Sequence, residues 1–113
     1  MATFDDLRRV GLALPGVQEV AWMNGDPALQ VGSKGFAMLL KGRLLMKLDK
    51  HHQEFLFEVR PEVFSPFTAG AMRWAWVDID AIDAEEAAEL TVEAWKQVSL
   101  KRTIKAWEVE RAG

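Results

Sequence analysis

The sequence contains no cysteine and no tyrosine. The lack of cysteine excludes disulfide frameworks, cysteine nucleophiles and thiolate metal sites. Long apolar runs are also missing, because the longest apolar stretches have only a few residues, whereas a membrane-spanning helix needs roughly 20. The first six residues carry neither a basic start nor an apolar run, which argues against a signal peptide. We therefore expect a cytoplasmic protein that spans no membrane.

Recognisable catalytic motifs are absent as well. No serine lies in a nucleophile-elbow context. Residues 32–35 lack the spacing of a phosphate-binding loop and precede a strand-like segment instead of a helix. The only two histidines, His51 and His52, are adjacent in the chain, and adjacent residues on a helix point about 100° apart. They cannot chelate one ion without distorting the helix, so we expect no enzyme, no metal site and no cofactor.

Length and charge bound the class of protein. The chain has 113 residues, half of them hydrophobic, and we predict a single domain over residues 1–113. Residues 34–60 carry six basic and three acidic side chains, whereas residues 78–93 carry seven acidic and no basic ones. The formal net charge is −3, and a dedicated nucleic-acid binder is usually basic overall. The charge therefore weighs against, without excluding, a nucleic-acid partner.

Hydrophobic periodicity predicts a helix, about four strands, a second helix, one or two strands, a long helix and a last short helix. Thr3 with Asp6 is typical of a helix start, as are Asp49 and Asp83 further along. An extended segment from Val17 to Met23 is followed by a turn from Asn24 to Pro27. Because the strands fall in hairpins, the expected fold is α+β in two layers. Its antiparallel sheet has about five to six strands, with the helices packed on one face.

A charged hairpin is the clearest local prediction. Residues 36–40 and 44–48 are strand-like and flank Lys41, Gly42 and Arg43. Residues 63–67 are expected to form an edge strand, because a proline there cannot donate to a neighbouring strand. Alternation along the first hairpin strand is expected to place Phe36, Met38 and Leu40 on one face.

The acidic run over residues 78–93 invites a metal or catalytic interpretation. Several of its carboxylates fall in the first turn of a predicted helix, where the helix dipole favours negative charge. Glu86, Glu89 and Glu93 recur on one side of that helix. We interpret these three as a solvated face.

Six short segments between Thr3 and Trp107 match a known pattern in their order and spacing. They are residues 3–9, residues 12–17 with Leu14-Pro15-Gly16, residues 35–37, residues 45–49, residues 74–78 and Ala94-Trp95. With these segments the chain resembles the MmcQ/YjbR family of small bacterial proteins. The resemblance implies a small α+β fold similar to CyaY-like and secretion-chaperone-like arrangements. Family members are often labelled DNA-binding because the fold resembles a double-wing motif, and a fold does not fix a function.

The resemblance also marks individual positions. Lys47 and Trp74 occupy characteristic family positions. The chain departs from the pattern by an additional tryptophan, Trp76, and by a compact hairpin turn at Gly42. The resemblance leaves open whether Lys47 serves a ligand or the sheet.

The first of three functions that the residues leave open is binding of nucleic acid. Lys41, Arg43, Lys47 and Arg73 would contact phosphates from the basic hairpin, in the manner of a wing. The competing interpretation is structural, because turns are often charged and sheet edges often carry lysine. On either interpretation the domain is a non-catalytic module.

The other two functions depend on the tryptophan strand. Trp74 and Trp76 share a strand face, with Trp74 as the first candidate, and could form a contact surface for a protein partner. The same surface would suit a weak homodimer, and otherwise the protein is a monomer. Alternatively, Trp74, Lys47 and Asp78 could line a pocket for a small ligand. The competing interpretation is that both indoles pack in the core.

Overall fold

The computed structural model describes residues 1–22 and 25–112. The strands form one sheet in the order β1-β2-β3-β4-β6-β5, and every neighbouring pair is antiparallel. Met23 and Asn24, at the end of the expected extended segment and the start of the expected turn, lie outside the described residues. The elements are α1 (Phe4–Gly11), β1 (Val17–Ala21), β2 (Pro27–Val31), β3 (Lys34–Leu40), β4 (Arg43–Met46), α2 (Lys50–Val59), β5 (Phe64–Ala69), β6 (Met72–Val77), a short 3₁₀ helix (Ile79–Ala81), α3 (Ala84–Lys96) and α4 (Lys101–Ala112).

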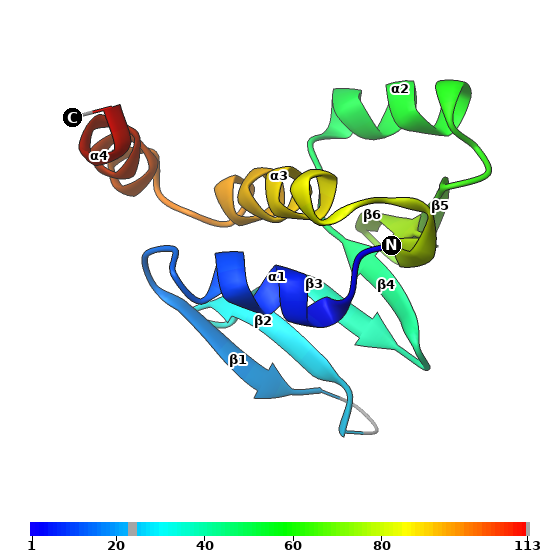
Figure 1. Ribbon diagram of the computed structural model, residues 1–113, viewed down its shortest axis with the longest axis horizontal. Helices are drawn as coiled ribbons and strands as arrows, with labels where there is room; N and C mark the ends of the chain where they lie inside the picture. The colour runs from blue at the N-terminus through cyan, green and yellow to red at the C-terminus, as the bar shows by residue number, and fades with distance from the viewer. Residues whose placement is uncertain (23–24, 113) are drawn as a thin grey trace.

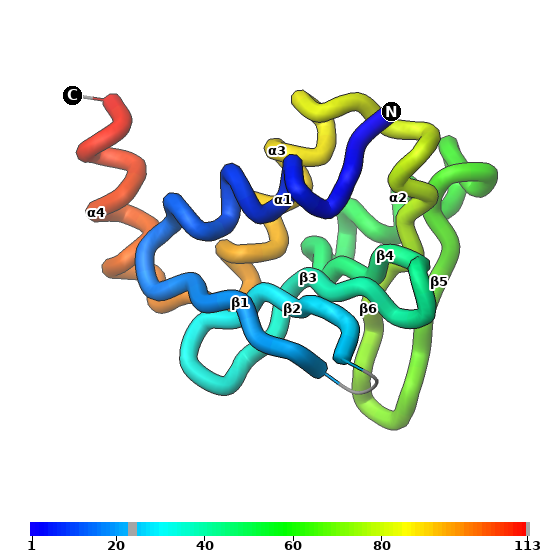
Figure 2. Tube along the Cα trace, turned by 60° about the horizontal axis from the view of Figure 1, so that its bottom comes forward, coloured from blue at the N-terminus to red at the C-terminus, as the bar shows by residue number. Residues whose placement is uncertain are grey.

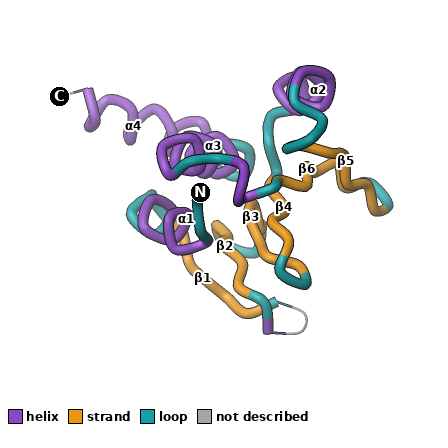
Figure 3. Tube along the Cα trace, turned by 45° about the vertical axis from the view of Figure 1, so that its right-hand side comes forward, coloured by secondary structure: helices purple, strands orange, loops and turns teal. Residues whose placement is uncertain are grey.

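The helices and the sheet form two layers. Helices α1, α2 and α3 lie on the same side of the strands (Figure 1), with α1 and α3 side by side and α2 nearest to β5 and β6. The same separation of helices from strands is visible in Figure 3. The predicted α+β fold, with an antiparallel sheet and helices on one face, is therefore confirmed.

Short polar side chains begin the helices as expected. The backbone N–H of Thr3 donates to Oδ2 of Asp6 at 2.8 Å. Asp49 accepts from two backbone N–H groups in the first turn of α2, both at 3.1 Å. Asp83 accepts from the backbone N–H of Glu86 at 2.8 Å. Each carboxylate satisfies N–H groups that have no partner within the helix, which stabilises the helix start.

The main core fills the space between the helices and the sheet. Trp95 of α3 is fully buried there, and its Nε1 donates to the carbonyl oxygen of Pro15 at 3.0 Å. Helix α1 approaches β2 closely at Gly11, where an added Cβ would lie 2.8 Å from Cδ1 of Leu29. Gly11 therefore sets how closely α1 packs on the sheet, although its position in a helix is otherwise unfavourable.

A bulge in β3 corrects the predicted strand faces. Gly35 pairs with Gln30 and Ala37 pairs with Leu29, so Phe36 is an extra residue without an opposing partner. Phe36 and Ala37 consequently both belong to the main core. The prediction that Phe36 shares a face with Met38 and Leu40 is therefore wrong, because simple alternation fails across a bulge.

The β3–β4 hairpin has a two-residue turn at Lys41 and Gly42, since Leu40 pairs with Arg43. Both turn residues have positive φ, 53° for Lys41 and 81° for Gly42, as the favoured type I′ hairpin turn requires. The predicted edge strand is also confirmed, because β5 is the last strand of the sheet and contains Pro66.

Helix α4 projects from the rest of the chain toward the C-terminus (Figure 2). It is attached at Trp107, whose ring lies 5.2 Å from that of Trp95, centroid to centroid. Lys96 Nζ also pairs with a carboxylate oxygen of Glu108 at 3.1 Å. None of the described helices is both long and apolar enough to cross a membrane.

Candidate functional site

The sheet face opposite the helices carries a second apolar cluster, which we call the open face. In the described part of the chain, every member of this cluster comes from a strand and no helix covers it (Figure 1). The buried members are Ala28, Met38, Leu45 and Trp74, and the half-buried members are Val20, Leu40, Phe67, Met72 and Trp76. A contiguous apolar surface of this kind is a common feature of interaction sites.

Trp76 makes both an aromatic contact and a cation–π contact on the open face. The ring of Phe67 meets it edge-on, with 5.3 Å between ring centroids. The guanidinium of Arg43 lies over the same ring, with its Cζ 3.9 Å from the centroid. Edge-on aromatic contacts and cation–π contacts are both attractive and have preferred geometries, so together they fix the orientation of the Trp76 ring.

The two tryptophans of β6 differ in exposure. Trp74 exposes only 7% of its surface, because its neighbours on the open face surround it. Trp76 is half-buried, so of the two candidate tryptophans it is the one that a partner reaches more easily. A third indole, Trp22, is 38% exposed and has an atom within 3.9 Å of the Cβ position of Gly35.

The tip of the β3–β4 hairpin is less free than its sequence indicates. Lys41 is exposed, and its backbone N–H donates to Oδ2 of Asp26 at 3.0 Å. Arg43 is exposed too, but its guanidinium is stacked on Trp76. The backbone of Lys41 is therefore held by a carboxylate, and the guanidinium of Arg43 is held by an indole.

The four cations of the predicted nucleic-acid site do not gather in one place. Strand β4 pairs with β6 so that Leu44 lies opposite Val77 and Met46 opposite Ala75. This register puts Arg43 at one end of β6 and Arg73 near the other, roughly 17 Å apart along an extended strand. The guanidinium of Arg73 donates to two nearby carbonyls, at 2.9 and 3.0 Å, in the β5–β6 turn.

A cavity of about 350 Å³ lies where β4 begins and β6 ends, beside the open face. Trp76, Arg43 and Ser65 form one part of its wall, and Glu62, Asp78 and Asp80 form another. The predicted small-ligand pocket included Asp78, which does line this cavity. Trp74 and Lys47, also expected there, do not.

The comparison with known proteins starts with a family model, YjbR, that matches residues 12–97. The chain belongs to the YjbR family. The matched residues include all six strands together with α2 and α3, whereas α1 and α4 lie outside the match. The resemblance expected from Thr3 to Trp107 is thus confirmed over its central part.

One solved structure supports the fold of this YjbR-family chain. It is the crystal structure of the Deinococcus radiodurans protein DR2400, described as a DUF419 domain, with 27% sequence identity. The alignment covers 89% of this chain and 81% of that chain, with a TM-score of 0.74. A search of curated proteins finds no match.

Two positions were expected to be characteristic of the YjbR family. Lys47 directly follows β4, is half-buried, and its backbone N–H donates to the carbonyl oxygen of Phe36 at 2.9 Å. Trp74 is buried in the cluster of the open face. Both positions therefore contribute to the sheet itself, Lys47 through its backbone and Trp74 through its ring.

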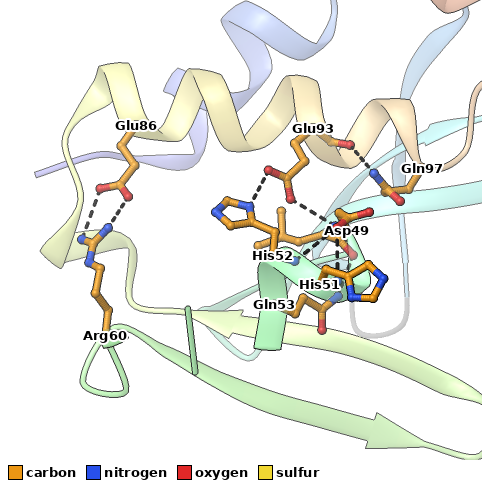
Figure 4. A network of polar contacts seen from close by, with 9 residues as sticks. Asp49, His51, His52, Gln53, Arg60, Glu86, Glu93 and Gln97 are labelled. Atoms are coloured by element: carbon orange, nitrogen blue, oxygen red, sulfur yellow. Dashed lines mark hydrogen bonds and ion pairs between the residues drawn. The ribbon is translucent and has the colours of Figure 1, made fainter. Parts of the chain in front are cut away.

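The acidic helix face is not wholly solvated, which corrects the prediction. Glu86 forms a two-pronged ion pair with Arg60, at the end of α2, and hydrogen bonding to Glu86 raises the pKa of the Arg60 guanidinium (Figure 4). Glu93 accepts from the backbone N–H of Asp49 at 3.1 Å and lies 2.6 Å from Nδ1 of His52. Only Glu89, of the three glutamates, is fully exposed.

These contacts attach α2 to α3 and to the sheet. The buried side chain of Gln53, which is labelled in Figure 4, donates to two carbonyl oxygens. They are those of Leu48, at 2.7 Å, and of Arg73, at 3.1 Å. His51 is exposed, whereas His52 is half-buried beside Glu93. In the described ranges, no group of three or more histidine, aspartate or glutamate side chains could hold a metal ion. The contacts of this network hold α2 against α3 and the sheet.

Sequence reasoning missed Phe67 as part of the open face, and it also missed Trp22 as an exposed indole. The sequence predicted that Phe67 lies in an edge strand, but it did not show that Phe67 lies opposite Trp74 in the neighbouring strand. Trp22 lies one residue beyond β1, where period-two alternation still places it with Val20. That alternation was the available signal for Trp22, whereas the position of Phe67 needed the strand order.

Proposed function

We propose that this protein is a non-catalytic binding domain whose open face binds an apolar segment of a protein partner. The observation that carries the proposal is the continuous cluster of apolar strand side chains opposite the helices. Its half-buried members give a partner an apolar surface to cover. Trp76 contacts Phe67 and Arg43. Tryptophan and arginine are among the residue types that most often dominate the binding energy of an interface.

Local charge favours a protein partner over DNA. Phosphate binding needs several cations that face one surface. Here Arg43 lines a cavity together with the carboxylates of Glu62, Asp78 and Asp80, and the backbone N–H of Lys41 donates to the carboxylate of Asp26. Arg73 lies at the far end of β6 and is directed to turn carbonyls. DNA binding through the hairpin is the alternative that the experiment must separate.

The test is selection of binding peptides from a random library displayed on phage, with the whole protein as bait. Selected peptides would be titrated by fluorescence anisotropy at two salt concentrations, and their binding site mapped by NMR. We expect peptides rich in apolar residues, affinity that changes little with salt, and shifted resonances at Leu40, Phe67 and Trp76. Phe67→Ser should weaken binding at least about tenfold, since a buried aromatic contact is lost.

Phe55→Ser is the matched control, because Phe55 is 59% exposed on α2, away from the open face. Equal loss of affinity in both variants would contradict the proposal. A labelled DNA duplex titrated under the same conditions tests the alternative. Tight binding that falls steeply with salt, and that is lost in the Lys41→Glu, Arg43→Glu double variant, would replace the proposal with DNA binding. Self-association through the same face would show that the partner is a second copy.

A further inference from the structure

The cavity at the start of β4 and the end of β6 supports an inference beyond the proposed function. We propose that it binds a small organic cation through a primary ammonium or guanidinium group. Its volume of about 350 Å³ is at the lower end of the usual size of ligand pockets, about 300–1,000 Å³. The cavity is therefore large enough for a small organic amine.

Trp76, which lines the cavity, already has the guanidinium of Arg43 over its ring. Arg43 Cζ lies 3.9 Å from the centre of the Trp76 ring, within the distance at which the ring attracts positive charge. Arg43 forms no ion pair in the described part of the chain, so the indole is its principal contact. The ring thus presents a surface on which a ligand cation would compete with, or lie beside, the guanidinium.

The charges around the cavity favour a cation further. Glu62, Asp78 and Asp80 line it together with Arg43, which leaves an excess of negative charge. Over the described residues, neither Glu62 nor Asp80 forms a direct ion pair, whereas Glu86 and Glu93 both do. The charge of Glu62 does contribute to the raised pKa of the Arg60 guanidinium, after hydrogen bonding to Glu86, which is the main cause. Ser65 adds a hydroxyl to the same wall. An ammonium group would pair with these carboxylates and contact the indole.

The cation could be a free amine or a basic side chain of a polypeptide, and the two sources share the same chemistry. Both are tested by NMR titration of the whole protein at low ionic strength, with spermidine and with Nα-acetyl-lysine amide as probes. The Nε-acetylated form of the second probe, which is neutral, serves as the comparator. We expect saturable shifts of the backbone amides of Gly42, Ser65 and Ile79 with the charged probes only. Saturation by spermidine alone would identify a free polyamine, and saturation by both would identify a basic side chain.

Substitutions separate this site from general attraction between charges. Glu62→Gln with Asp80→Asn should weaken binding about tenfold, because two carboxylates near the ligand are lost. Glu85→Gln with Glu89→Gln removes the same charge from exposed positions on α3, outside the cavity, and should change affinity less than about twofold. Arg43→Gln should strengthen binding about threefold to tenfold, since it removes a competing cation.

The Arg43→Gln variant gives the most decisive test of the proposal. Weaker binding in this variant would show that Arg43 contacts a negative group of the ligand and would overturn the proposal. Shifts that do not saturate, or an equal effect of the two carboxylate double variants, would overturn it as well. Phe67→Ser, which tests the open face, changes no residue that lines the cavity. The two proposals can therefore fail separately.

Discussion

The two faces of the sheet have similar composition but different surroundings. On the covered face, side chains such as Phe36, Leu44 and Phe64 are packed beneath helices and exposed at 1% or less. On the open face, Met72 and Trp76 are only half-buried, because strand neighbours alone surround them. Apolar area removed from water stabilises the fold at roughly 25 cal/mol per Å². The covered face should therefore supply most of the stability, whereas the open face leaves apolar area that the proposed partner would cover.

This comparison also explains where charge is placed. On the covered side, the acidic residues of α3 are neutralised by Arg60 and approached by His52 at the contact with α2. Beside the open face, Arg43 is stacked on an indole and the carboxylates of Glu62 and Asp80 remain unpaired among the described residues. The paired charges attach α2 to α3, and the carboxylates beside the cavity are those that the proposed cation would contact.

The largest expected effect is that of Phe36→Ala on the covered face. Phe36 is fully buried in the main core, where the rigid surroundings would leave a cavity. We expect a loss of about 3–5 kcal/mol in the free energy of unfolding, measured by urea denaturation. A loss below about 1 kcal/mol would show that the bulge lets the core collapse around the missing ring, and would contradict the comparison of the two faces.

The position of Phe36 also illustrates what sequence could predict and what it could not. The alternation in β6 correctly assigned Trp74 and Trp76 to one face, because side-chain direction in a regular strand depends only on local geometry. The bulge placed Phe36 on the opposite face, because a bulge depends on how β3 pairs with β2, and alternation along one strand does not contain that information. The hydrophobic and turn patterns therefore predicted the fold class well, and the pairing between strands decided the details.

The candidate site was less predictable for the same reason. Arg43 and Arg73 were grouped because both are basic and border strands, but the antiparallel pairing of β4 with β6 separates them. Glu86 was assigned to solvent because its partner, Arg60, lies 26 residues earlier in the chain. Local patterns predict which side chains lie on a surface, and the strand order decides which of them meet.

A smaller effect is expected for Trp76→Ala on the open face. Trp76 is half-buried and makes its described aromatic and cation contacts only with Phe67 and Arg43. We expect urea denaturation to give a loss of about 1–2 kcal/mol in the free energy of unfolding, because less apolar area is uncovered. A loss as large as that of Phe36→Ala would mean that the open face is a second core, and a docking surface would no longer be needed to explain it.

The smallest effect concerns the contact between Arg43 and Trp76, measured by a double-mutant cycle with Arg43→Gln and Trp76→Leu. The guanidinium lies 3.9 Å from the ring centre but is exposed, so water weakens the attraction. We expect a coupling of about 0.5–1 kcal/mol in the free energy of unfolding. Stability measured at high salt should change this value little, since a cation over an aromatic ring is less screened than an exposed ion pair. A coupling near zero would mean that Arg43 does not hold the indole in place, and that the ring on the open face is free for a partner's side chain.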